Sequence, residues 1–358
     1  MVPGAGDHPM SRALVTGGSG YFGSLLVQSL LQRGDEVRTL DLNDTDDRPE
    51  SVEFVGGDIR DAAVTREAVD GVDVVYHNVA QVPLAKDEYL LRTVNVDGTR
   101  LLLEAAADAG VLKVVHTSSS AVFGVPERNP VLPSDVPQPG EAYGHAKLAA
   151  EWACLDAAAR GHDVSIVRPR TILGHGRLGI FGILFDWIAD GADPVVLGRG
   201  DNRYQFVHAD DLAQACIREG VLDGSAILNV GAGDVHTMAE TLRTLCAHAG
   251  TGAAVRALPA GATAAAMQLG SRLGVLPFAP YHWLMYARSM WFDTEHVAER
   301  LGWLPETSTP EMFAESYDWF LENRSRADSA DASHHRRSTR QGGLALAKGL
   351  TGLLPEAP

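Results

Sequence analysis

The amino-acid sequence predicts an α/β protein that is built on a doubly wound parallel sheet and followed by a smaller mixed α/β lobe. From residue 11 to about residue 175, short β-branched runs alternate with longer segments of helical periodicity. The short runs are apolar throughout, as parallel strands buried between two helical layers require. A glycine cluster also follows the first run, where a doubly wound sheet often binds a ligand.

The first half of the chain supplies the elements of this sheet in order. The strands are predicted at residues 13–16, 36–42, 52–58, 73–80, 111–120 and 163–170. Helices are predicted at residues 24–34, at 96–110 and around the segment "AYGHAK" at 142–147. Gly34 is the expected C-cap of the first helix.

The regular alternation ends beyond Arg170, so we expect a substrate-binding lobe at residues 176–324 after a nucleotide-binding domain at 11–175. Mixed helical and strand-like segments run from 183 to 231, and two amphipathic helices are predicted at 293–303 and 309–323. Residues 325–358 are polar over most of their length, which predicts a disordered tail. The alternative is that its last stretch, "LALAKGLTGLLPEA", forms a short docking helix.

Composition restricts the class of partner. The formal charge is −16, with 30 basic and 46 acidic residues, which opposes broad binding to nucleic acid or to anionic lipid. The three cysteines are widely spaced, with no CxxC motif and no nearby histidine cluster, so neither a disulfide framework nor a zinc or other metal site is predicted. The chain contains no apolar run of the length of a signal peptide or membrane span, and we expect a cytoplasmic protein.

The segment "VTGGSGYFG" predicts a phosphate-binding turn. Its glycines fit either G-x-x-G-x-x-G, with Gly17, Gly20 and Gly23, or G-x-G-x-x-G, with Gly18 first. Between a strand and a helix, such glycines let backbone amides and the helix dipole reach a pyrophosphate, and the neighbouring Tyr21 and Phe22 would border it. The alternative is a tight turn with no ligand.

The ends of the second and third predicted strands indicate which dinucleotide is bound. Asp41 stands where a carboxylate accepts hydrogen bonds from the adenosine ribose, and the three residues after it include no Lys or Arg to neutralise a 2′-phosphate. NAD is therefore predicted as the cofactor rather than NADP. Asp58, with Ile59 beside it, is placed to border the adenine, although an exposed turn aspartate gives the same pattern.

Tyr143 and Lys147 are four residues apart and share one face of the predicted helix. A nearby ammonium favours the phenolate, which can accept a proton when a hydroxyl group is oxidised. Ser118, Ser119 and Ser120 end the preceding strand, at the edge of the sheet where ligands bind. The alternative is an ordinary pair of polar neighbours on a helix.

Several motifs in order resemble the extended short-chain dehydrogenase/reductases of the NAD-dependent epimerase/dehydratase family. The resemblance runs from about residue 12 to 323 through "TGGSGYFG", "GDIRD", "VNVDGT", "SSSAVFG", "YGHAK", "VRPRTILGHG", "FVHADDLA", "NVGAG" and "FDTEHVAERLGW". It implies a Rossmann-type fold, a homodimer, and a catalytic set of Ser119, Tyr143 and Lys147. It also suggests that Asn95 lies near the nicotinamide, with a buried capping role as the alternative.

The family resemblance narrows the reaction. Sugar 4,6-dehydratases of the family carry an Asp and a Glu directly after the catalytic Thr, whereas this chain has Ser120 and Ala121 there. We therefore expect no 4,6-dehydratase activity. The remaining reactions are 4-epimerisation of a nucleotide sugar and the net oxidation or reduction of an alcohol. A non-catalytic NAD-binding regulator is the third possibility.

Two arginines and one threonine indicate the class of substrate. Arg203 stands where similar epimerases keep a phosphate-binding arginine, and Arg288 is a second candidate; either can instead be a surface ion-pair partner. Thr171 occupies a position where nucleotide-sugar enzymes usually have a phosphate-binding Asn. "VRPRTILGHG" resembles the matching segment of 3β-hydroxysteroid dehydrogenases, which makes a hydrophobic-alcohol dehydrogenase the alternative to a nucleotide-sugar enzyme.

Overall fold

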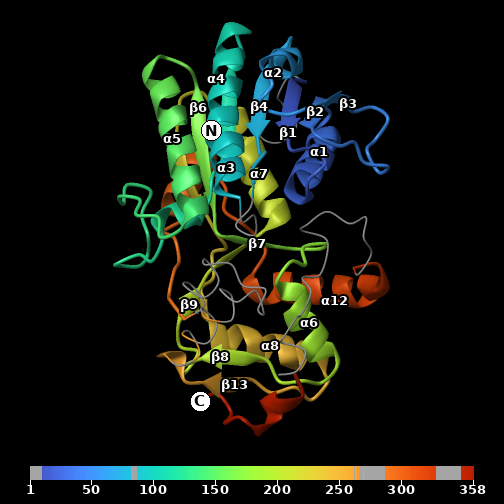
Figure 1. Ribbon diagram of the computed structural model, residues 1–358, viewed down its shortest axis with the longest axis vertical. Helices are drawn as coiled ribbons and strands as arrows, with labels where there is room; N and C mark the ends of the chain where they lie inside the picture. The colour runs from blue at the N-terminus through green and yellow to red at the C-terminus, as the bar shows by residue number, and fades with distance from the viewer. Residues whose placement is uncertain are drawn as a thin grey trace.

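A seven-stranded sheet forms the centre of the larger part of the molecule (Figure 1), in the order β11-β6-β5-β4-β1-β2-β3. Every neighbouring pair is parallel. The strands are β1 (Arg12–Thr16), β2 (Glu36–Asp41), β3 (Glu53–Gly56), β4 (Val74–His77), β5 (Lys113–Thr117), β6 (Val164–Pro169) and β11 (Ile227–Val230). The computed structural model describes residues 10–81, 87–261, 287–327 and 348–358, with 263, 265 and 269. The predicted doubly wound fold is confirmed.

Helices cover both faces of this sheet, which is why its strands are apolar on both sides. One face packs against α1 (Tyr21–Arg33), α7 (Ala209–Gly220) and α11 (Glu295–Leu301). The other face packs against α2 (Ala62–Val69), α4 (Thr99–Asp108) and α5 (Ala142–Ala159). Helix α1 ends as predicted, because Gly34 has φ +96° and its amide bonds back to the carbonyls of Leu30 and Leu31.

The smaller part lies beyond the carboxyl ends of the strands (Figure 1). Its apolar core joins α6 (Phe181–Ala189), α8 (Met238–Ala249) and α12 (Thr309–Ala327). Three two-stranded sheets border it: β7 (Thr171–Leu173) with β10 (Phe206–His208), β9 (Arg203–Tyr204) with β12 (His236–Thr237), and β8 (Val195–Leu197) with β13 (Arg256–Leu258). The short elements α3 (Glu88–Arg92), η1 (Thr93–Gly98) and η2 (Ser120–Phe123) belong to the larger part.

The expected division of the chain at residue 175 is wrong for three later elements. β11 pairs with β6 and completes the edge of the main sheet, while α7 and α11 cover one of its faces. The chain therefore leaves the larger part after β6, returns for α7 and β11, and returns again for α11. The local patterns of these segments predict helix and strand, but they do not show which surface each element packs against.

The end of the chain also differs from the predicted tail. Residues 348–358 pack on the smaller part, where the amide of Ala257 donates to Pro355 and that of Ala357 donates to Val255, both at 2.9 Å. Within η3 (Lys348–Leu353), the Lys348 ammonium forms ion pairs with Asp186 and Asp190 at 2.7 Å. The prediction of disorder is therefore wrong for this last stretch, whereas residues 328–347 of the predicted tail lie outside the described residues.

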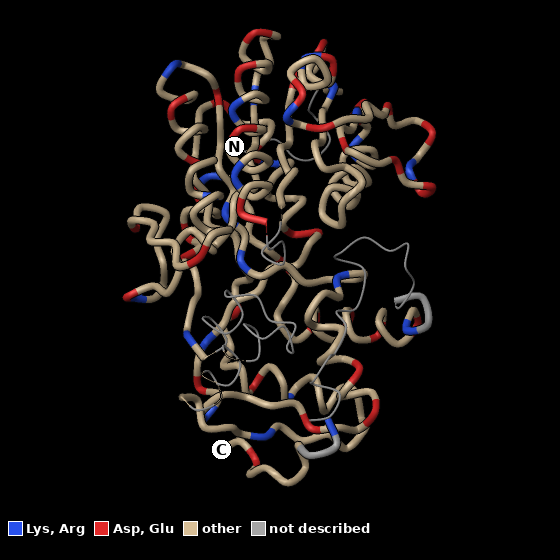
Figure 2. The backbone as a smooth tube through the Cα atoms, in the orientation of Figure 1, with Lys and Arg blue, Asp and Glu red and all other residues tan. Residues whose placement is uncertain are grey.

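Charged residues are interspersed along both parts of the described chain (Figure 2). The excess of acidic residues is thus spread over the molecule. Among the described helices, none combines the length and the apolar character that crossing a membrane requires.

Candidate active site

The glycine-rich turn between β1 and α1 forms a close backbone approach. Gly17 has φ +73° and donates its amide to Leu40 at 2.8 Å. A Cβ on Gly23 would lie 2.0 Å from the Gly17 carbonyl oxygen, so only glycine fits there. Gly20 caps α1 in an extended conformation without a side chain, and the first turn of α1 contains no acidic residue. These amides suit an anion such as a dinucleotide pyrophosphate, which supports the predicted cradle.

Asp41 links this cradle to the end of β2. Its carboxylate accepts the amides of Ser19, at 3.1 Å, and Leu42, at 2.7 Å. Burial raises the pKa of Asp41 above its usual value, although these hydrogen bonds act in the opposite direction. The residue therefore stands at the edge of the sheet beside the cradle, in the position predicted for contact with a ribose.

The other predicted cofactor residues lie close to the same region. Asp58 forms a 2.5 Å ion pair with Arg60, whose guanidinium lowers the pKa of that carboxyl. Ile59 is buried against Gly98. Tyr21 is the buried first residue of α1, and Phe22 packs into the core beneath it. Contact between these side chains and NAD stays a prediction.

Tyr143 and Ser119 meet at the carboxyl end of β5. Helix α5 begins at this point because the Glu141 carboxylate accepts the amides of Tyr143, at 2.9 Å, and Gly144, at 2.7 Å. The Ser119 side chain is close enough to the Tyr143 phenol to lower its pKa. Ser119 itself caps η2 by accepting the amide of Ala121 at 3.2 Å. The structure therefore brings together two of the three predicted catalytic residues.

A residue that the sequence analysis missed acts on the phenol. Burial raises the pKa of Tyr143 to about 12, while Ser119 and the Arg177 guanidinium lower it. Arg177 lies in the glycine-rich segment after β7 and stacks on the Tyr21 ring, 5.3 Å from its centroid. A cation in a glycine-rich loop at the sheet edge is a sequence signal for a residue of the site. The sequence of the loop does not show which helix Arg177 approaches.

Lys147 lies one turn further along α5 and points to the main chain of β5. Its ammonium donates to the Thr117 carbonyl at 2.6 Å, and only 2% of the residue is exposed. Burial lowers the pKa of Lys147 to about 8, despite the nearby carboxylate of Glu151. The groups that shift the pKa of Tyr143 do not include Lys147, which differs from the expected direct effect of the ammonium on the phenol.

A buried hydrogen-bond network lies beneath this edge of the sheet. Thr99 donates to the Asn95 carbonyl at 2.7 Å, so its oxygen accepts from His77 Nε2 at 2.8 Å. His77 Nδ1 then accepts from Thr16 at 2.8 Å. Burial lowers the pKa of His77 to about 3, which keeps the ring neutral in this tautomer. The network ties α4 to the ends of β4 and β1.

Asn95 anchors the segment that follows β4. Its side-chain oxygen accepts the Gln81 amide at 2.7 Å, and its nitrogen donates to the Gln81 carbonyl at 3.1 Å. The residue is buried in η1, a single π-helical turn of a kind often found at functional sites. These bonds describe the capping role that was the alternative for Asn95, and a contact with the nicotinamide stays a prediction.

A second buried network holds the end of β5 against α5 and β6. Ser118 donates to the Glu151 carboxylate at 2.5 Å, and Arg168 binds the same carboxylate through two nitrogens at 2.7 and 2.9 Å. This bidentate pair is almost fully buried and restrains the main chain next to Ser119. Neither Glu151 nor Arg168 was singled out in the sequence, because their pairing requires the fold.

The residues predicted to bind substrate lie in the smaller part. Thr171 shares a 3.0 Å hydrogen bond with the Tyr204 hydroxyl. Arg203 and Arg288 are exposed on neighbouring segments, since the Arg203 amide donates to Ser289 and Met290 donates back to Arg203. Among the described residues, neither guanidinium has an ion pair. The structure thus places the two arginines next to each other in the fold.

The fold and site together define a dinucleotide-binding α/β protein of the short-chain dehydrogenase/reductase type. The chain belongs to the NAD-dependent epimerase/dehydratase family, whose family model matches residues 13–231. Its cofactor is NAD, in agreement with the sequence prediction. The cradle glycines and Asp41 fit this cofactor.

Relatives of known sequence include proteins of more than one activity. An uncharacterised protein of Sinorhizobium fredii, y4nG, is 47% identical over 97% of this chain and 88% of the relative. A UDP-glucose 4-epimerase of Mycolicibacterium smegmatis is 32% identical over 86% of this chain and 98% of the relative. A 3β-hydroxysteroid dehydrogenase/Δ5→4-isomerase of Mycobacterium tuberculosis is 35% identical over 61% of this chain and 64% of the relative.

Solved structures show the same fold. A Thermotoga maritima UDP-glucose 4-epimerase with UDP-glucose superposes with a TM-score of 0.74 at 21% identity, covering 87% of this chain and 99% of that one. The dTDP-glucose 4,6-dehydratase DesIV of Streptomyces venezuelae, with NAD bound, gives 0.71 at 26% identity, covering 88% and 98%. The first likeness shows the fold alone.

Proposed function

We propose that this protein is an NAD-dependent enzyme that oxidises and reduces a secondary hydroxyl group of a nucleotide sugar, as a 4-epimerase does. The proximity of Ser119 to the Tyr143 phenol carries this proposal, because a proton acceptor and a second hydroxyl group at the carboxyl edge of the sheet suit the oxidation of a hydroxyl group. The full-length similarity to a UDP-glucose 4-epimerase supports the substrate class.

The side chains divide the proton chemistry between them. NAD, when bound, accepts a hydride from the carbon that carries the hydroxyl group and returns it on reduction. Tyr143 removes the hydroxyl proton as the carbonyl forms and gives it back on reduction, while Ser119 hydrogen-bonds the same oxygen and orients it. Arg177 favours the phenolate electrostatically. Lys147, whose ammonium donates to the Thr117 carbonyl, lies one helical turn from Tyr143 on the same helix and supplies a positive charge there.

The same site lacks the groups that elimination of water needs. Ser120 and Ala121 are buried in η2, directly after Ser119. Ala121 has no acid or base to offer, which supports an enzyme that is not a 4,6-dehydratase. DesIV shares the fold, so this distinction rests on the side chains and not on the architecture.

The neighbouring Arg203 and Arg288 support a binding site for the diphosphate of a nucleotide sugar. Binding of a free nucleoside diphosphate therefore tests the proposed substrate class. Charge-assisted hydrogen bonds to a pyrophosphate contribute roughly 1.5–3 kcal/mol each, so Arg203→Ala should weaken binding at least tenfold. Free UDP and TDP are titrated calorimetrically into the NAD-loaded protein and into this variant. Binding that is lost with Arg203, while NAD stays bound, supports a nucleotide-sugar enzyme.

A second candidate is a dehydrogenase of steroids or similar hydrophobic alcohols. Thr171 favours this candidate, because nucleotide-sugar enzymes usually carry an Asn at this position. The Thr171 hydroxyl is instead hydrogen-bonded to Tyr204. The partial similarity to a 3β-hydroxysteroid dehydrogenase agrees with it. Absence of UDP and TDP binding, together with NAD reduction by a hydrophobic secondary alcohol, would select this candidate.

The assembly and location implied by the family resemblance stay predictions. A homodimer is expected, and light scattering of the purified protein measures its mass. A cytoplasmic location is also expected, and fractionation of the source cells tests it.

A further inference from the structure

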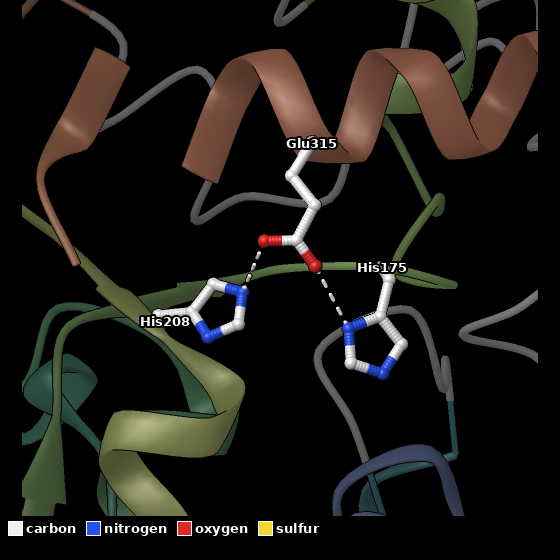
Figure 3. A group of neighbouring side chains, drawn as sticks. All are labelled: His175, His208 and Glu315. Atoms are coloured by element: carbon white, nitrogen blue, oxygen red, sulfur yellow. Dashed lines mark hydrogen bonds and ion pairs between the residues drawn. The ribbon is translucent and has the colours of Figure 1, made fainter. Parts of the chain in front are cut away.

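Three side chains from distant parts of the chain converge at the junction between the two parts of the molecule (Figure 3). His175 Nδ1 lies 2.9 Å from one carboxylate oxygen of Glu315, and His208 Nε2 lies 3.0 Å from the other. The three potential ligand atoms are all within 4.8 Å of one another. His175 follows β7, His208 ends β10 and Glu315 lies on α12. Two imidazoles and a carboxylate therefore face a common point.

The His208 ring is buried and directed at the Glu315 carboxylate. The residue is 4% exposed, and its Nε2 lies 3.0 Å from the Glu315 oxygen. Space beside Nε2 exists because residue 174 is glycine: a Cβ there would lie 2.8 Å from that nitrogen. Any side chain at residue 174 would therefore close the space next to this nitrogen.

We propose that His175, His208 and Glu315 bind a zinc ion, with water in the fourth position. Two imidazole nitrogens and one carboxylate oxygen form one of the ligand sets that zinc prefers. At zinc–ligand distances of about 2.1 Å, tetrahedral ligands lie roughly 3.4 Å apart, so separations of up to 4.8 Å need to close by at most about 1.4 Å, shared between two side chains. His175 and Glu315 are half-exposed, which gives the ion and its water access from solvent.

Zinc binding requires a proton to move on His208. Its Nδ1 accepts the Asp210 amide at a long 3.3 Å, an arrangement that places the ring proton on Nε2. When the metal takes Nε2, the ring proton moves from Nε2 to Nδ1, so the imidazole stays neutral. The Asp210 carboxylate, 3.8 Å from Nδ1, is close enough to accept a hydrogen bond from the protonated Nδ1 after a small shift. A metal-bound histidine usually has such a second partner.

The ion would restrain a segment that matters to the candidate active site. His175 lies two residues before Arg177, the cation that acts on Tyr143. Because Glu315 lies on α12, a bound zinc would fasten this segment to the smaller part. The expected role is therefore structural, and the proposal does not depend on which hydroxyl group the enzyme oxidises.

A second histidine–carboxylate pair, outside the cluster, provides a control. His248 Nε2 and Asp318 Oδ1 form a 2.8 Å contact, similarly exposed, that is not part of the three-residue cluster. His248→Ala is thus the control for losing one exposed histidine–carboxylate contact. His175→Ala and Glu315→Gln each remove one ligand. His208 is left unchanged because it caps α7.

The experiment uses the full chain without a histidine tag, treated with a chelator and desalted. ZnCl₂ is titrated calorimetrically, and zinc per chain is counted after dialysis. Since the sequence has 13 histidines, including the adjacent His334 and His335, the assignment rests on differences between variants. Thermal unfolding with and without zinc gives a second measurement, because an ion that binds the folded state raises the midpoint.

We expect the wild type and His248→Ala to bind one zinc ion at least about 100-fold more tightly than His175→Ala or Glu315→Gln. Zinc should raise the unfolding midpoint only in the first two proteins. Equal zinc affinity in all four proteins would overturn the proposal, as would the absence of zinc binding by the wild type. Since zinc binding is measured without substrate, these outcomes are separate from any failure of the proposed enzymatic function.

Discussion

The Lys147 ammonium donates a 2.6 Å hydrogen bond to the Thr117 carbonyl oxygen, so the helix that carries Tyr143 is fastened to the end of β5. This contact is made to the main chain of β5 and not to the phenol. Lys147 thus combines two roles, holding α5 in place and supplying a buried positive charge. The cost of burying that charge appears in its pKa, which is lowered to about 8 from 10.5.

The lowered pKa of Lys147 predicts a pH-dependent stability. Below about pH 8 the buried ammonium destabilises the folded state. Between about pH 8 and 10.5 the unfolded chain still binds this proton while the folded chain has lost it. The folded state therefore becomes more stable as the pH rises through this range. Lys147→Met should therefore gain stability relative to wild type near pH 7.5, and the gain should shrink near pH 9.5. Urea unfolding of both cofactor-free proteins at these two pH values measures it. A difference that does not change with pH would contradict the prediction.

Tyr143→Phe should remove the proton acceptor and leave the cradle intact. Because one oxygen is lost and the ring keeps its packing, turnover should fall at least ~10²–10⁴-fold with little change in NAD affinity. Steady-state kinetics and calorimetry measure the two effects separately. A variant with a near-normal rate would exclude Tyr143 as the general base.

Arg177 should determine the pH at which the phenol works. Its guanidinium lowers the pKa of Tyr143, so Arg177→Met should move the rising part of the pH–rate profile to higher pH. Arg177→Lys keeps the positive charge and should restore most of the profile. Turnover measured across pH for the three proteins tests this, and an unshifted profile in Arg177→Met would argue against an electrostatic role.

Asp41 should make the enzyme prefer NAD to NADP. A 2′-phosphate would bring negative charge against this carboxylate, so NAD should bind more tightly, and Asp41→Asn should reduce the preference at least about tenfold. Asp46→Asn, which alters an exposed aspartate of the following segment, is the control. Calorimetric titration with both dinucleotides measures the ratio; equal binding by the wild type would contradict the expectation.

His116→Leu should stabilise the protein, and more strongly in acid. Both ring nitrogens of His116 are buried without hydrogen-bond partners among the described residues, an arrangement that costs about 1–3 kcal/mol. Burial also holds its pKa well below 6.5, so stability is lost as the pH falls below that value and only the unfolded chain binds the proton. Unfolding at about pH 7.5 and pH 5 should show a gap that widens in acid. His145→Leu, on the exposed side of α5, is the control.

Local patterns in the sequence determined the main sheet and the core of the site. Strands buried on both faces must be apolar throughout, and a tight phosphate-binding turn needs glycine at Gly17 and Gly23, so both features are visible in short stretches. Tyr143 and Lys147 share a helix face by their spacing alone. For these features the physical cause lies within a few residues of the pattern.

Only the tertiary structure decided which distant segments meet. Its packing returns β11 to the edge of the main sheet, sets Arg177 beside Tyr143 and docks residues 348–358 on the smaller part. His175 and Glu315 meet although 140 residues separate them. Hydrophobic periodicity shows that a segment buries one face, but not which surface covers it, because that choice depends on contacts between elements far apart in the chain.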